Sequence, residues 1–145
     1  REENMTWLFW AILAAAFAGL TAILAKVGVE DVNSNLATAI RTVVVLIFSW
    51  GIVWFSGEAR GLTTLSRRTI VFLVLSGLAT GLSWLCYFRA LQLGQASQVA
   101  PIDKLSVLFA LVLAALFLGE KLSWHHWLGG ALILSGAIVI AFKSN

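Results

Sequence analysis

Five charged residues interrupt stretches of this chain that are otherwise apolar, and they are the first candidates for chemistry. They are Lys26, Arg41, Arg89, Asp103 and Lys104. A charge inside a membrane helix costs about 2.5–3.5 kcal/mol on insertion scales, so each one needs a partner or a function. The set holds four cations and one carboxylate. We therefore expect it to attract an anionic or zwitterionic small molecule.

The other reactive side chains do not form a catalytic or metal-binding group. Cys86 is the only cysteine and lies in an apolar stretch. His125 and His126 are neighbours, which places them about 100° apart around a helix and makes them a poor chelating pair. No histidine, cysteine or carboxylate has a partner at catalytic spacing. We therefore predict that the protein is not an enzyme and that it binds neither a metal nor a cofactor.

The composition indicates the solvent in which these charges are placed. Hydrophobic residues make up 60% of the 145 residues and charged residues 12%, whereas a soluble domain is about half apolar and about a quarter charged. The chain has too little polar surface to cover a globule, so its solvent must be largely lipid. Its ten lysines and arginines are spread along the chain, so no basic patch is available to a nucleic acid.

Five apolar segments have the length of about 20 residues that is needed to cross a hydrocarbon core of about 30 Å. They cover residues 6–25, 35–57, 69–92, 98–118 and 123–142. The sequence therefore predicts an all-α integral membrane protein with five transmembrane helices. We expect one transmembrane domain over residues 5–143, in the inner or plasma membrane. Met5 is the only methionine, so residues 1–4 are interpreted as an added tail before the native start.

Because consecutive spans alternate in direction, the five charges fall in the same half of the membrane. Lys26 and Arg89 lie near helix ends, where long side chains can reach the headgroups at little cost. Arg41 lies deeper, about two turns into segment 35–57, and the short side chain of Asp103 cannot reach as far towards the headgroups. Two uses of these two remain open. Asp103 forms a structural ion pair with Arg41 or Lys104, or the charges bind a substrate or an ion.

The third and fourth spans each allow a structural and a functional interpretation. Trp84 and Tyr87 lie on one face of segment 69–92, where they either pack against a helix or line a cavity. Ser97 is expected to cap the fourth span, with Pro101 in its first turn. If that helix begins earlier, Pro101 breaks it and frees a carbonyl, as at the half-helix binding sites of transporters. The cap interpretation is favoured.

The loops give a weak prediction of orientation. The side that holds the N-terminus and the loops after the second and fourth spans carries Arg1, Arg60, Arg67, Arg68 and Lys121. Six tryptophans also lie near helix ends on this side, as in an interfacial aromatic belt. The positive-inside rule places this side in the cytoplasm. Counting the cations within the spans makes the two sides equal, so either orientation is feasible.

Several stretches together resemble a known family. They are Tyr87-Phe88-Arg89-Ala90-Leu91, Ala96-Ser97, Ala100-Pro101, Leu118-Gly119-Glu120-Lys121-Leu122-Ser123 and Trp127-Leu128-Gly129-Gly130-Ala131-Leu132. They resemble the EamA module of the drug/metabolite transporter superfamily, and Lys26 and Arg41 look like that module as well. The resemblance covers essentially the whole chain. It implies a five-helix half of an inverted-repeat fold whose helices 1 to 4 line a central cavity.

The resemblance also implies a secondary transporter of small polar metabolites, amino acids or drugs. The substrate-binding residues are then expected to be Arg41, Trp84, Tyr87, Arg89, Asp103, Lys104 and Lys26. Arg41 and Lys104 would attract the substrate, and Asp103 would act as a counter-ion or proton carrier. The aromatic residues would select its shape.

Most family members carry two such modules in inverted orientation, whereas this chain has one. Alternating access is commonly supplied by two repeats that rock about a site at the membrane midplane. We therefore expect a homodimer. The weak orientation bias permits an antiparallel pair, and a parallel pair stays open. The alternative is a non-transporting assembly subunit or a lipid-binding membrane protein, in which the charges pair or meet lipid phosphates.

Overall fold

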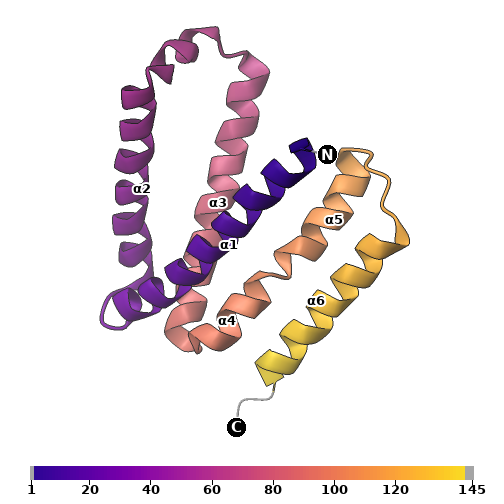
Figure 1. The fold of residues 1–145 in the computed structure, drawn as a ribbon. Coiled ribbons are helices and arrows are strands. Elements are labelled where there is room, and N and C mark those ends of the chain that lie inside the picture. The colour runs from indigo at the N-terminus through magenta and orange to yellow at the C-terminus, as the bar shows by residue number, and fades with distance from the viewer. Residues whose placement is uncertain (1, 143–145) are drawn as a thin grey trace. The chain divides into compact units, whose positions relative to one another are not determined.

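The computed structural model describes residues 2–142, and every described element is a helix. In chain order the elements are α1 (Glu2–Val29), α2 (Ser34–Ser56), the 3-10 helix η1 (Glu58–Thr64), α3 (Arg67–Leu93), α4 (Ala96–Asp103), α5 (Ser106–Phe117) and α6 (Trp124–Phe142) (Figure 1). The predicted domain boundary at residue 143 and the first residue of the predicted tail lie outside the described residues. The all-α prediction is confirmed.

Five stretches of the described chain are long and apolar enough to cross a membrane. They are Thr6–Val29, Ser34–Ser56, Arg67–Leu93, Ala96–Phe117 and Trp124–Phe142, with mean hydropathies between 1.6 and 2.2. At most 11% of the most apolar window of each stretch is buried inside the protein. A bilayer is the solvent in which so much exposed apolar helix is stable, because each helix satisfies its own backbone hydrogen bonds. The predicted multi-pass membrane protein with five transmembrane helices is confirmed.

The chain divides into two compact units. Unit 1 consists of residues 1–26 and 93–145, so it holds most of α1 together with α4, α5 and α6. Unit 2 consists of residues 27–92 and holds α2, η1 and almost all of α3.

The fourth span, in unit 1, is two helices because the chain turns at Lys104 and Leu105 between α4 and α5 (Figure 1). The Lys104 N–H donates to the Pro101 carbonyl at 3.1 Å, and the Leu105 N–H donates to the Ile102 carbonyl at 2.9 Å. Both bonds follow the tighter 3-10 pattern rather than the α-helical one. Asp103 and Lys104 therefore lie where the span changes from one helix to the next.

The interpretation of Ser97 as a helix cap with Pro101 in the first turn is wrong. The helix begins at Ala96, and its N-cap residue Gln95 makes no side-chain capping bond. Instead the Gln95 carbonyl accepts a hydrogen bond from the Val99 N–H at 3.0 Å, so the main chain alone closes the first turn. Pro101 then lies inside the helix. Its missing N–H deprives the Ser97 carbonyl of the donor that an uninterrupted helix would provide.

In unit 1, α6 packs along both halves of the broken span (Figure 1). The Gln98 side-chain amide donates to the Ala141 carbonyl at 3.3 Å, which ties α4 to the end of α6. Gly130 of α6 is buried, and a Cβ atom there would lie 2.7 Å from Leu108 Cδ2 of α5. A side chain at Gly130 would therefore require Leu108 to move, so this glycine favours the close packing of α5 on α6.

In unit 2, η1 lies in the corner that joins α2 to α3. Gly57 ends α2 in the left-handed conformation at φ 75°, and its N–H donates to the Trp54 carbonyl at 3.3 Å. Ser66 caps α3, because its Oγ accepts a hydrogen bond from the Thr69 N–H at 3.1 Å. Every residue from 61 to 80 is exposed. This part of the unit therefore has contact surface available for lipid or for another subunit.

Candidate functional site

Unit 2 holds a cation–aromatic cluster formed by Arg41, Trp84 and Phe88. The Arg41 Cζ atom of α2 lies 4.4 Å from the centroid of the Trp84 ring and 5.4 Å from that of the Phe88 ring. The two rings are four residues apart on α3, so they lie on the same helix face. Both distances are within the range of about 6 Å in which a cation is attracted to an aromatic face.

Arg41 is placed well inside the second span. It lies seven residues after Ser34, the first residue of α2, which corresponds to about 10 Å along the helix axis. Arg41, Trp84 and Tyr87 are half-buried, and Phe88 is only 3% exposed. At a desolvated site a cation–aromatic contact is worth about 2 kcal/mol. The cluster thus offsets part of the free-energy cost of placing this guanidinium at such a depth.

The contacts of the Arg41 guanidinium within unit 2 are with aromatic residues. No carboxylate among the described residues of unit 2 forms an ion pair with it, and no described carbonyl or side chain of the unit accepts a hydrogen bond from it. Tyr87 is close enough to Arg41 for an electrostatic interaction. The guanidinium has five N–H donors, and the aromatic rings bring no carboxylate or carbonyl oxygen to them.

Arg89 is not part of this cluster but stabilises the end of α3. Its Nη1 donates to Gln92 Oε1 at 3.1 Å. The Gln92 side-chain amide in turn donates to the carbonyls of Val29 and Val32, at 3.2 and 2.6 Å. These bonds satisfy carbonyls at and just beyond the end of α1. The contacts of Arg89 therefore indicate a structural role. Arg89 binds Gln92, and Gln92 binds carbonyls at the end of α1 and in the loop between α1 and α2.

Lys26, in unit 1, also binds a main-chain group. Its Nζ donates to the Gly94 carbonyl at 3.1 Å, which joins the end of α1 to the turn before α4. Gly94 lies between the last residue of α3 and the first of α4, where carbonyls lack helical partners. Lys26 is half-buried. Its contacts, like those of Arg89, are those of a residue that satisfies a helix end.

Asp103 and Lys104 form an ion pair at the break between α4 and α5. Lys104 Nζ lies 3.4 Å from Asp103 Oδ2, and the two side chains are 55% and 37% exposed, respectively. Of the two ion pairs that the sequence left open, the structure shows this one. An exposed pair of this kind contributes about 0–1 kcal/mol, so the charges are held weakly. Asp103 lies seven residues into α4, or about 10 Å from its start.

Two residues that contribute to these contacts were not predicted from the sequence. Phe88 forms the second wall around Arg41, and its position four residues after Trp84 was the available signal. Gln92 carries three of the hydrogen bonds at the end of α3. Its signal was a polar amide in the last turn of an apolar helix.

The histidines have structural contacts. The His126 ring nitrogen Nδ1 accepts a hydrogen bond from the Ser123 N–H at 3.1 Å, next to the first residue of α6. The His125 ring lies 3.9 Å from the Trp124 ring, measured between centroids. Within residues 2–142, no group of three or more histidine, cysteine or carboxylate side chains is placed to hold a metal ion.

Five membrane-length stretches, four of which carry charged side chains inside their spans, define a class, the multi-pass membrane proteins with polar intramembrane sites. Within that class the chain belongs to the EamA-like transporter family, whose family model matches residues 5–142. The resemblance to the EamA module is confirmed.

Two groups of relatives match the chain. An "uncharacterized transporter in cobO 3'region" from a Sinorhizobium species is 54% identical over 138 residues, which cover 95% of this chain and 98% of the relative. A "probable 4-amino-4-deoxy-L-arabinose-phosphoundecaprenol flippase subunit ArnE" from Yersinia pestis is 30% identical over 89 residues, covering 61% of this chain and 75% of the relative. The same subunit from Yersinia pseudotuberculosis matches equally. No solved structure matches the chain. The family and these relatives support a membrane transporter, and the relatives are named as transporters or flippase subunits rather than enzymes.

Proposed function

We propose that this protein transports a small polar metabolite with a carboxylate or phosphate group, as a homodimer in the inner or plasma membrane. The observation that carries the proposal is the Arg41 guanidinium, held against Trp84 and Phe88 about 10 Å into its span with no carboxylate partner in its unit. A cation at this depth without such a partner marks a candidate site for a charged ligand.

The geometry around Arg41 favours an anion that binds and leaves again. A guanidinium presents its donors as a planar fork that fits a carboxylate or phosphate with two parallel hydrogen bonds. The aromatic rings compensate the cation and bring no carboxylate or carbonyl oxygen of unit 2 to that fork. A fixed carboxylate at the same place would compete with the substrate. Asp103 and Lys104, in unit 1, supply a second, weakly held pair of charges that we assign to the substrate or coupling-ion path.

Two features support a two-module assembly. The matched regions make up 98% and 75% of the two relatives over 138 and 89 residues, so both relatives are short chains. The ArnE relative is named as a subunit. Alternating access requires two elements that move against each other, and a second copy would supply the other element.

The transport proposal is tested with purified protein in proteoliposomes. Uptake of labelled amino acids, small carboxylates and sugar phosphates identifies the substrate, and Arg41→Gln is then compared with the native chain. Loss of a charge-assisted hydrogen bond reduces binding about tenfold or more, so uptake at low substrate concentration should fall by that factor. Lys121→Gln is the control, because Lys121 is an exposed cation in the loop between α5 and α6, outside the spans. Equal loss in both variants would remove Arg41 from the binding site.

Dimer geometry is tested separately, by reporters fused to the C-terminus that signal the side on which it lies. Two populations of one chain would support an antiparallel homodimer. A single population would favour a parallel pair or a different, complementary partner. Neither result depends on knowing the substrate.

A second candidate is a subunit that flips a lipid-linked anion instead of a free metabolite. The ArnE relative favours it, as does the exposed stretch from residue 61 to 80, which leaves one side of unit 2 accessible to lipid. Cysteines introduced at positions 41 and 103 distinguish the candidates. Labelling by a water-soluble reagent supports a path for soluble solutes, whereas protection at both positions together with transbilayer movement of a lipid-linked phosphate supports the flippase.

A further inference from the structure

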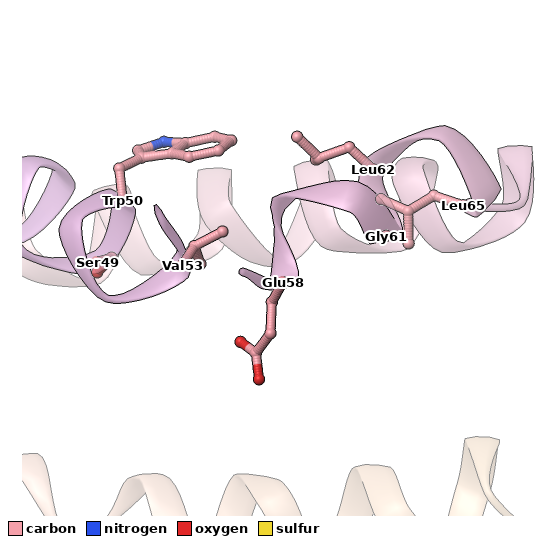
Figure 2. A pocket seen from close by; sticks show the side chains of 7 residues that line it. All are labelled: Ser49, Trp50, Val53, Glu58, Gly61, Leu62 and Leu65. Atoms are coloured by element: carbon pink, nitrogen blue, oxygen red, sulfur yellow. The ribbon is translucent and has the colours of Figure 1, made fainter. Parts of the chain in front are cut away.

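The corner between α2 and η1 contains a hollow of about 320 Å³. The apolar side chains that line it include Trp50 and Val53 from α2, and Leu62 and Leu65 from the chain that follows (Figure 2). The Trp50 indole and the Leu62 side chain lie on the same side of the ribbon, whereas the Glu58 carboxylate points to the opposite side (Figure 2). The volume falls at the lower end of the range of about 300–1,000 Å³ that is typical of ligand pockets.

Local backbone chemistry explains why this hollow is apolar. The left-handed Gly57 turns the chain so that η1 follows α2 closely. The hydroxyl groups of Thr63 and Thr64 donate to the carbonyls of Arg60 and Gly61, at 3.1 and 2.8 Å. These hydroxyls are therefore engaged by the helix itself. An occupant of the hollow would meet mostly hydrocarbon and an indole ring, and the polar residues of the lining are Ser49 and Glu58.

The segment that carries the hollow is basic. Arg60 lies in η1 next to the lining residue Gly61, and Arg67 and Arg68 follow the lining residue Leu65 at the start of α3. All three arginines are exposed. The hollow itself involves α2 residues 49–53, which lie about 5–10 Å from the end of that span. In a bilayer that α2 spans, we therefore expect the apolar walls at the depth of acyl chains and the three arginines nearer the headgroups.

We propose that this corner binds one anionic phospholipid, with part of an acyl chain in the hollow and the phosphate among Arg60, Arg67 and Arg68. Basic residues at the membrane surface attract anionic lipids, and tryptophan is the residue type enriched at that level. Charge complementarity separates this hollow from a second one on α2. The second hollow, of about 560 Å³, is lined by Ile47, Phe48, Gly51, Ile52, Phe55 and Ser56 and includes no charged residue.

The two hollows provide a matched pair of variants. Gly61 lines the first and Gly51 the second, and a Cβ atom at either position would have no atom within 4 Å. Gly61→Phe therefore adds a large side chain to the lining of the proposed lipid site at a position with room for its Cβ atom, and Gly51→Phe does the same at the uncharged hollow. Arg60→Gln removes one headgroup contact while leaving the hollow open.

The test measures lipid that stays bound to the purified full chain, by native mass spectrometry after incubation with phosphatidylglycerol or phosphatidylcholine. We expect the native chain to retain one phosphatidylglycerol in preference to phosphatidylcholine. Gly61→Phe should lose it and Gly51→Phe should keep it. Arg60→Gln should weaken retention about fivefold, the factor expected for one arginine at an anionic surface.

Three results would overturn the proposal: equal retention of the two lipids, equal loss in the two phenylalanine variants, or a hollow that is covered by a second copy of the chain. The last is read from disulfide formation between copies of Leu62→Cys in a Cys86→Ser background. The readout is lipid rather than solute, so the result is independent of the transport assay.

Discussion

Replacement of Trp84 separates the proposed role of the cation–aromatic cluster from simple packing. Trp84→Leu keeps an apolar side chain on α3 but removes the ring whose centroid lies 4.4 Å from Arg41 Cζ. Phe88 remains, 5.4 Å away and almost fully buried. A cation–aromatic contact is worth about 0.5–1 kcal/mol when exposed and about 2 when desolvated. For a half-buried pair we expect a loss of about 1–2 kcal/mol, or about 5–30-fold in apparent substrate affinity.

The assay is initial-rate uptake in proteoliposomes across a range of substrate concentrations. We expect the KM to rise in Trp84→Leu while the maximal rate changes little. The reason is that Trp84 positions Arg41 for binding and takes no part in the movement of the substrate across the membrane. Trp84→Phe should be intermediate, since it keeps an aromatic face. Trp54→Leu is the control, because Trp54 on α2 is 78% exposed. An unchanged KM in Trp84→Leu, or equal effects of leucine and phenylalanine, would refute a cation–aromatic role.

Three further changes test the structural account. Gly130→Leu should lower the free energy of unfolding, measured by thermal melting in detergent, by about 1–3 kcal/mol, because its side chain would overlap Leu108. Gly129→Leu, with open space at its Cβ, should change this free energy little. Gln92→Leu should destabilise by about 1–3 kcal/mol in the same melting assay, because two main-chain carbonyls lose their donor. Asp103→Asn should abolish proton-driven uptake but preserve substrate exchange, since an amide keeps the shape and cannot carry the proton; unchanged coupling would leave Asp103 only its pairing with Lys104.

The spans could be predicted because their signal is local. A run of about 20 apolar residues identifies a membrane helix by itself, so five stretches followed without any knowledge of their partners. The break in the fourth span could not be predicted in the same way. Pro101 fits both a first turn and a helix interior, and the choice depends on the Gln95 carbonyl closing the first turn. Any residue type at position 95 would supply the same main-chain carbonyl, so the sequence does not indicate this hydrogen bond.

The candidate site was predicted by residue type but not by grouping. Arg41 and Trp84 come from different helices, 43 positions apart in the chain, and only the fold of unit 2 brings them together. Lys26 and Arg89 have the same charge as Arg41, and sequence reasoning placed all three in one site. Their partners are the Gly94 carbonyl and the Gln92 amide oxygen. Carbonyl partners cannot be predicted from composition, so the sequence contains no sign of these contacts, and a role of Lys26 and Arg89 in substrate binding stays a prediction.

The chain compensates its intramembrane cations in three ways, and the chemistry of each bears on function. Lys104 has a carboxylate 3.4 Å away, Lys26 has a carbonyl, and Arg41 has the faces of two rings. A carboxylate or a carbonyl occupies the donors that an anionic ligand would need. A ring instead attracts the cation through the ring face and brings no carboxylate or carbonyl oxygen to the N–H groups. Among these cations Arg41 is the one for which the described residues of its own unit supply no carboxylate or carbonyl partner, and for this reason we propose the anion site there.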